Sequence, residues 1–346
     1  MAYTGLDDPS AHFQATTYTG DGNTSRAVTN GGNSDLQPDW VWIKDRNQAV
    51  NHVTYDSSRG ATKRLYVDFA SSEATQSEGV QAFSSDGFTL GNASASNQNS
   101  IPFIAWQWHA NSGTTSTNSS GATDSTVQAN TTAGFSIVTF TTTGSTTTFG
   151  HGLGVKPNVI ISKYRSGSPW YLFTDIVSGS MQYGVWNDTN AFANSSYDAP
   201  TSTVFQYNDD ASRTHVAYCF AEKQGYSKFG KYTATGNANG PFIYLGFKPA
   251  FIMTKRTDTA GYHWRIYDAK RNPFNIVNAR LSANNTDAEY SGTSGNEHAD
   301  FLSNGFKWKT AASDQNVSGG TYFYMAFAEN PFVTSDDGGS IPTTAR

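Results

Sequence analysis

One motif occurs three times in this 346-residue chain, and its repetition constrains the fold more than any other feature. In each copy a proline precedes a short aromatic or β-branched run that ends on a lysine, and an aspartate follows farther along. Its residues are Pro38, Lys44, Asp56 and Arg59 in copy one, Pro157, Lys163 and Asp175 in copy two, and Pro249, Lys255, Asp268 and Arg271 in copy three. A unit that returns in the same order predicts three copies of one supersecondary structure.

The flanking sequence predicts that each copy is built from short strands. The apolar runs after the prolines have the length and residue types of buried strands. Asp86-Gly87 and Asn304-Gly305, each between phenylalanines, predict hairpins in copies one and three, and copy two lacks this signal. We therefore expect an all-β chain of three tandem β-sandwich repeats joined by Ser/Thr/Gly-rich linkers. The pattern leaves open whether the repeats are independent or share a core.

The same landmarks give the expected boundaries. They predict an N-terminal arm over 1–12, repeats over 13–110, 133–222 and 226–332, a linker over 111–132, and a surface tail over 333–346. The simpler interpretation is that the arm is a frayed terminus. The alternative is that it lies along a neighbouring subunit.

Composition narrows the classes of function. The net charge is -5 without a basic tract, so we expect no nucleic-acid partner. The single cysteine excludes an intrachain disulfide and a cysteine-based zinc site, and Cys219 is expected to be buried. Neither a secretory signal nor an apolar run of membrane-spanning length is present, so no membrane insertion is expected and synthesis in a cytoplasm is expected.

The search for chemistry gives no catalytic, cofactor-binding or metal-binding residues. The repeated lysines and aspartates are expected to form cross-strand ion pairs that fix hairpin register, extended by Arg59 and Arg271, because an enzyme seldom needs its site three times in one chain. The glycine-rich stretch 150–154 lacks the residues of a phosphate loop and is expected to be a turn. The seven histidines show no metal-ligand spacing.

Aromatic residues offer the other candidate site. Five tryptophans could stack on sugar rings, although tryptophan in a strand is more often part of a core. These are Trp106, Trp108, Trp170, Trp186 and Trp264. Trp186 is expected to be exposed on a loop, and His151 is expected at a loop tip. We treat both as candidate glycan contacts.

Several segments together resemble a family of repeat-containing virion structural proteins of tailed bacteriophages, common in phages of marine bacteria. They are residues 18–22, 38–44, 56–60, 86–91, 150–154, 217–222, 302–307 and 342–346. The resemblance spans nearly the whole chain and implies a tail-fibre-like or capsid-surface protein. It implies no catalytic residues.

From the resemblance we expect a non-enzymatic virion protein on the particle surface, as capsid decoration or cement or as a tail or fibre component. Expected partners are other capsid or tail proteins and further copies of the chain, with a trimer as one arrangement. The alternative is a receptor-binding adhesin that recognises host-surface glycans. A polysaccharide depolymerase is the third class, but it would need paired carboxylates that the sequence does not single out.

Overall fold

The computed structural model describes residues 6–291 and 298–331, and the backbone of 333–336 and 339–342. In this part of the chain every pairing between the named strands is antiparallel. The helices are a 3-10 turn, η1 (Pro9–Ala11), and one helical turn, α1 (Ser94–Asn97). The all-β prediction is confirmed.

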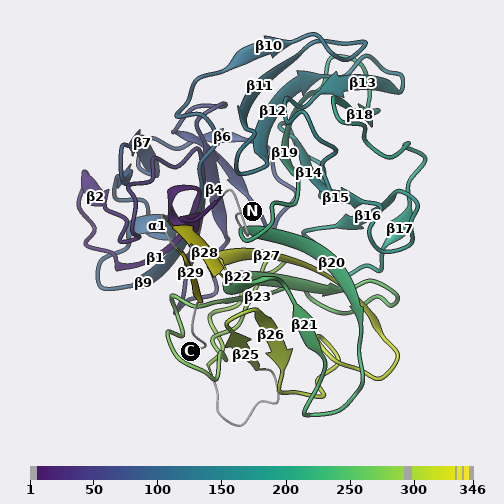
Figure 1. Cartoon of the computed structure of the whole chain (residues 1–346). Helices are drawn as coiled ribbons and strands as arrows, with labels where there is room; N and C mark the ends of the chain where they lie inside the picture. The colour runs from purple at the N-terminus through teal and green to yellow at the C-terminus, as the bar shows by residue number, and fades with distance from the viewer. Residues whose placement is uncertain (1–5, 292–297, 332, 337–338, 343–346) are drawn as a thin grey trace.

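The strands form three lobes around a common centre (Figure 1). We call them the first (13–108), second (116–220) and third (227–331) lobes. The first contains β1 (Phe13–Thr19), β2 (Arg26–Val28), β3 (Trp40–Asp45), β4 (Val53–Asp56), β5 (Lys63–Tyr66), β6 (Ala74–Thr75), β7 (Val80–Ser84), β8 (Gly87–Leu90) and β9 (Pro102–Trp108).

The second lobe contains β10 (Ser116–Asn118), β11 (Ser125–Asn130), β12 (Phe135–Thr141), β13 (Thr147–Gly150), β14 (Val159–Tyr164), β15 (Trp170–Thr174), β16 (Gln182–Val185), β17 (Ala193–Asn194), β18 (Val204–Tyr207) and β19 (Thr214–Phe220). The third contains β20 (Ser227–Thr233), β21 (Phe242–Tyr244), β22 (Phe247–Arg256), β23 (Arg265–Asp268), β24 (Leu281–Ser282), β25 (Ala299–Leu302), β26 (Gly305–Trp308) and β27 (Thr321–Pro331). A hairpin, β28 (Val333–Asp336) and β29 (Gly339–Pro342), follows.

The large sheets of the three lobes share one strand order. Their shared part is β1-β9-β3-β4-β5 in the first lobe, β12-β19-β14-β15-β16 in the second and β20-β27-β22-β23-β24 in the third. A smaller sheet accompanies each: β2-β8-β7, β13-β18 and β21-β26-β25. The two predicted hairpins are β7–β8 and β25–β26, whose Phe83–Phe88 and Phe301–Phe306 pairs lie opposite each other.

Two groups of apolar clusters hold this arrangement together. Each lobe has its own cluster, in which side chains from its large and its smaller sheet meet. A further cluster, the central core, takes buried residues from all three large sheets. Burial of a large apolar side chain contributes roughly 1.5–3 kcal/mol, so the central core joins the lobes strongly. The question of independent or shared cores is thereby answered in favour of a shared one.

The segments predicted as arm, linker and tail each contain secondary structure. The segment 111–132, predicted to be a linker, instead carries β10 and β11, which extend the sheet of the second lobe. Residues 1–5 of the predicted arm lie outside the described residues, whereas Leu6 is buried in the central core and Asp8 caps η1. The described backbone of the predicted tail pairs as β28–β29.

Candidate functional site: the interfaces between the lobes

The strand registers show which residues occupy equivalent positions in the lobes. The β3–β4 pairing places Asp56 opposite Trp40, and Asp268 has the equivalent place in the third lobe. In the second lobe the register of β14 and β15 assigns this place to Thr174. Asp175, which the spacing in sequence matched to the other two aspartates, lies one residue beyond it.

A cluster of charged side chains, buried at Asp56 and Arg59 and half-buried at Glu73 and Arg165, joins the first lobe to the second. Asp56 Oδ2 accepts hydrogen bonds from Arg59 Nε at 2.5 Å and from the Tyr218 hydroxyl of the second lobe at 2.6 Å. Arg59 Nη1 also donates to Glu73 at 2.9 Å, and Arg165 of the second lobe binds both oxygens of Glu73 at 2.9 and 2.7 Å. The peptide N–H of Glu73 donates to the carbonyl of Arg165.

An equivalent cluster of different residues joins the third lobe to the first. Asp268 Oδ2 accepts from Arg271 Nε at 2.6 Å and from Trp106 Nε1 of the first lobe at 3.0 Å. Arg271 donates to Glu289 at 3.1 Å, and Arg46 of the first lobe binds both oxygens of Glu289 at 2.8 and 2.7 Å. The peptide N–H of Glu289 again donates to the carbonyl of the paired arginine, Arg46.

The third interface, from the second lobe to the third, carries no charge at these positions. Thr174 replaces the aspartate, and Met325 stands where the other lobes place Tyr218 and Trp106. The carboxylate and its donor are therefore missing together. Phe192 keeps the backbone bond, donating to the carbonyl of Thr257 at 2.9 Å, while its ring packs on that of Trp264.

Electrostatics agrees with the geometry of the two charged interfaces. Burial alone would lower the pKa of Arg59, but the nearby carboxylates of Asp56 and Glu73 raise it above its usual value. Burial would raise the pKa of Glu73, and Arg165 and Arg59 lower it. Glu289 follows the same rule, since burial is opposed by Arg46 and Arg271 and the net change lowers its pKa.

The repeated lysines are buried, and their ammonium groups bind carbonyl oxygens. Lys44 Nζ donates to the carbonyl of Thr286 in the third lobe at 3.1 Å, and Lys255 Nζ donates to that of Thr189 in the second at 3.3 Å. Lys163 instead binds carbonyls of its own loop. Burial lowers the pKa of Lys44 and Lys255 to about 8, and burial together with Arg59 lowers that of Lys163 to about 7.

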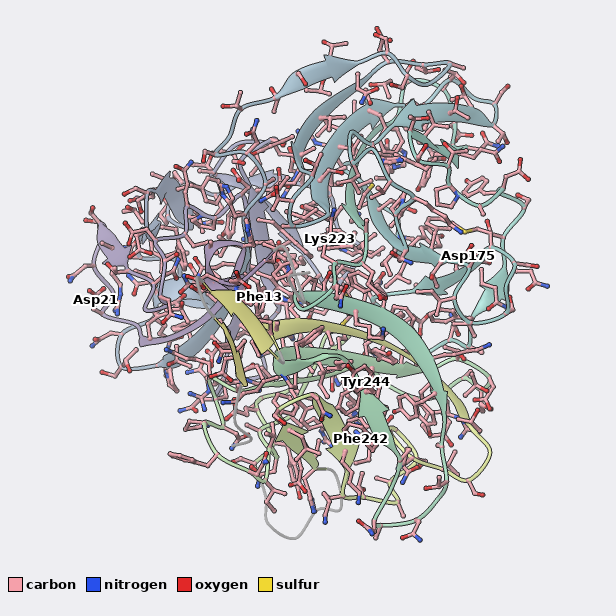
Figure 2. The ribbon with its side chains drawn as sticks, viewed as in Figure 1. Phe13, Asp21, Asp175, Lys223, Phe242 and Tyr244 are labelled. Carbon is pink, nitrogen blue, oxygen red and sulfur yellow. The ribbon has the colours of Figure 1, made fainter. Side chains whose placement is uncertain are left out.

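The predicted cross-strand ion pairs between these lysines and aspartates are therefore wrong. Asp56 and Asp268 instead form ion pairs with Arg59 and Arg271. These are the two arginines that were expected to extend the predicted pairs. Asp175, which Figure 2 labels in the second lobe, pairs with Lys156 near the surface. Lys44 lies four residues along β3 from the residue opposite Asp56, and the ammonium groups of the three lysines bind backbone carbonyls instead of carboxylates.

The three prolines lie where their missing N–H groups suit the sheets. Pro38 and Pro157 are buried and each lies two residues before the start of a strand, β3 or β14. Pro249 lies inside β22, at a shift in register with β27. Proline is tolerated at strand starts and bulges because it cannot donate to the ladder.

The two candidate glycan contacts are buried. Trp186 is 1% exposed and packs at 5.2 Å and nearly perpendicular to Trp42 in the central core. It takes the place that Val67 and Ala283 take in the other lobes, as the equivalent backbone hydrogen bonds show. His151 is 0% exposed. The predicted exposure of both side chains is wrong, and the other four candidate tryptophans are also buried. Burial of Cys219 is confirmed.

Sequence reasoning missed Arg46, Arg165, Glu73 and Glu289. A signal for the arginines exists, because each follows a repeated lysine by two residues. The glutamates come from loops with different spacings, and no pattern marks them. Asp39 was also missed: its buried carboxylate accepts hydrogen bonds from the backbone N–H groups of Ala110, Ser112 and Gly113, and it fixes the connection between the first and second lobes.

The second lobe has a pocket on the side of its large sheet that faces away from the central core. Its volume is about 430 Å³, within the range of small-ligand sites. Five tyrosines, each from a different segment of this lobe, line it together with Asp209. Among the described residues no group of three potential metal ligands occurs, and no helix there is long and apolar enough to cross a membrane.

A family model matches residues 8–331, nearly the whole chain. The chain belongs to this family. Its description is "Domain of unknown function (DUF7483)". No curated protein and no solved structure shows a significant match. The match covers all three lobes, so the DUF7483 unit is the three-lobed body as a whole.

Proposed function

We propose that this DUF7483 protein is a non-enzymatic structural component of a bacteriophage virion, exposed on the outside of the particle as capsid decoration or cement or as a tail or fibre component. The same proposal takes each lobe as one β-sandwich repeat. The observation that carries it is the locking of three lobes on one core, with buried charge clusters at two of the interfaces. Such a body is stiff and presents three similar faces about one centre, which suits a passive part of an assembly.

The motifs that resemble phage virion proteins hold positions in this scaffold. Residues 38–44 contain all of β3 except its last residue, and 56–60 carry the Asp56–Arg59 pair. Residues 217–222 include the part of β19 that supplies Tyr218. Three of the eight resembling segments therefore contribute contacts between the lobes, which supports a role that depends on shape.

Expected partners are other virion proteins and further copies of this chain. One chain already arranges three related lobes about a centre, as a trimer of single-repeat chains would, and such a body fits a three-fold position in a particle. A trimer of this chain would have three times its mass of 37.4 kDa. Native mass spectrometry of the purified protein distinguishes a trimer from a monomer.

The decisive experiment is location on the particle. Antibody labelling of intact virions with gold is expected to mark the outer surface, either over the capsid or at the tail. Label confined to the tail would remove the decoration and cement roles. Absence of the protein from purified virions would overturn the proposal.

The second candidate function is a host-attachment adhesin that binds surface glycans. The pocket of the second lobe favours it, because aromatic rings beside polar groups are the usual means of binding sugars. Pre-incubation of host cells with the purified protein is expected to reduce phage adsorption. Unchanged adsorption at saturating protein would exclude this function.

A further inference from the structure

The pocket of the second lobe exists because this lobe lacks a strand that the other two have. The smaller sheets of the first and third lobes contain three strands, and that of the second contains only β13 and β18. The extra strands, β7 and β25, cover the outer face of the large sheet. Gly79, beside β7, approaches Tyr55 so closely that a Cβ there would lie 2.1 Å from the hydroxyl oxygen. Tyr267 similarly shares a cluster with Ala299 of β25.

The uncovered face of the second lobe carries tyrosines. Tyr171 alternates along β15 with Leu172, which belongs to the central core, so its ring points away from that core. Its counterpart in the first lobe is Val53, which is fully buried. Tyr183 of β16 meets Tyr171 edge to face, with ring centroids 5.7 Å apart. Both rings are half-buried and form part of the pocket wall.

Internal hydrogen bonds hold the other walls in place. The Tyr197 hydroxyl donates to the carbonyl of Asn208 at 3.0 Å and accepts from the N–H of Asn208 at 3.0 Å. The Asp209 carboxylate binds Arg213 at 2.6 Å and lies 3.1 Å from His215 Nε2. A site whose walls are already fixed loses little conformational entropy when a ligand binds.

We propose that this pocket binds a neutral saccharide, with a sugar ring packed against the side chains of Tyr171 and Tyr183 and its hydroxyls on the polar rim. Tyrosine rings offer flat apolar surfaces that suit the C–H faces of a pyranose. The rim supplies donors and acceptors from Ser168, Asn194, Ser195, Ser196 and Asn208.

The charge of the pocket determines the class of sugar. No lysine or arginine is among the lining residues, and Asp209 is the charged residue there. An acidic sugar would meet this carboxylate without a cation to bind it. Arg213 already forms ion pairs with both Asp209 and Asp210, so its positive charge is balanced by these two carboxylates. Uncharged hexose units avoid the repulsion, and the carboxylate can accept hydrogen bonds from their hydroxyl groups.

The test is titration calorimetry of the isolated full-length chain with maltohexaose, laminarihexaose, chitotriose and, as the acidic probe, a galacturonic acid trimer. At least one neutral probe is expected to bind, and the acidic trimer is expected to bind at least tenfold more weakly. Tyr171→Ala and Tyr183→Ala are each expected to weaken binding about tenfold, the loss of one ring contact. Tyr244→Ala is the matched control, since this exposed tyrosine lies in the third lobe (Figure 2) and its loss is expected to leave affinity unchanged.

Absence of binding to all neutral probes would overturn the inference, as would preference for the acidic trimer or binding that survives the Tyr171→Ala/Tyr183→Ala double variant. Thermal unfolding of each variant checks that a lost signal is not lost folding. The inference deepens the adhesin function, on which its biological meaning rests. Calorimetry measures saccharide binding without host cells. If the protein does not inhibit phage adsorption, the adhesin function fails but the saccharide site can still be confirmed, whereas a failure to bind saccharides is seen directly in the calorimetry.

Discussion

At the scale of single residues, two interfaces depend on buried carboxylates whose bonds cross between lobes. Removing one partner from a buried ion pair is costly because it leaves the other charge uncompensated. The third interface shows the other solution, since Thr174 and Met325 remove both the charge and its donor. In all three interfaces the carboxylate and its donor are therefore either both present or both absent.

Asp56→Asn should destabilise the fold by about 3–5 kcal/mol, because Arg59 stays buried with less compensating charge. Asp175→Asn is the matched control: its partner Lys156 is 43% exposed, so a loss below about 1 kcal/mol is expected. Urea unfolding followed by tryptophan fluorescence measures both free energies. Equal losses in the two variants would contradict the assigned role of Asp56.

The buried lysines predict a dependence of stability on pH. The pKa of Lys163 is about 7 in the folded chain and near 10.5 when unfolded, so between these values the unfolded state binds more protons. The free energy of unfolding should therefore rise with pH, by about 2 kcal/mol from this group between pH 7 and 9. Lys163→Met should remove that part of the rise, whereas Lys228→Met, at a surface ion pair, should not. An unchanged slope in Lys163→Met would refute the prediction.

At the scale of elements, the sequence allowed prediction of the repeated strands and the two hairpins. Short β-branched and aromatic runs bounded by turn residues are local signals, and local signals suffice for such elements. The sequence did not allow prediction of β10 and β11, because their Ser/Thr-rich residues resemble a linker. Their strand structure depends on pairing, of β10 with β11 and of β11 with β12. The equivalence of Thr174 escaped as well, since a one-residue difference in hairpin length is visible only in the register.

The hairpin of β7 and β8 can be tested through its glycine. Gly87 has a φ of 108°, and a Cβ there would lie 2.0 Å from the carbonyl oxygen of Val28. Gly60 has nearly the same φ, 109°, but its nearest neighbour would be a flexible lysine carbon at 3.7 Å. Gly60→Ala should therefore cost about 1–2 kcal/mol from backbone strain alone, and Gly87→Ala about 2–5 kcal/mol from strain and overpacking. Similar losses in urea unfolding would show that the smaller sheet yields easily.

At the scale of the whole molecule, the site could not be predicted from the sequence because it lies between repeats. The hydrogen bond between Asp56 and Tyr218 spans 162 positions of the sequence, and no local pattern indicates such a pair. The tryptophans were marked as candidate surfaces for sugars, yet they form the core that three large sheets share. In a tandem array each repeat contacts only its neighbours in sequence. Here the first and third lobes also meet, through Asp268 and Trp106, which closes the arrangement.

Closure predicts that the chain unfolds as one unit. Loss of one lobe would expose its part of the central core together with the facing parts of both other lobes, so partly unfolded states carry a large apolar penalty. Differential scanning calorimetry of the full chain should therefore give a single transition in which the van't Hoff and calorimetric enthalpies agree. Lobes that unfold independently would give a van't Hoff enthalpy of about one third of the calorimetric value. That result would mean that the apolar cluster within each lobe, and not the central core, determines stability. The central core would then be an interface between independently folded domains.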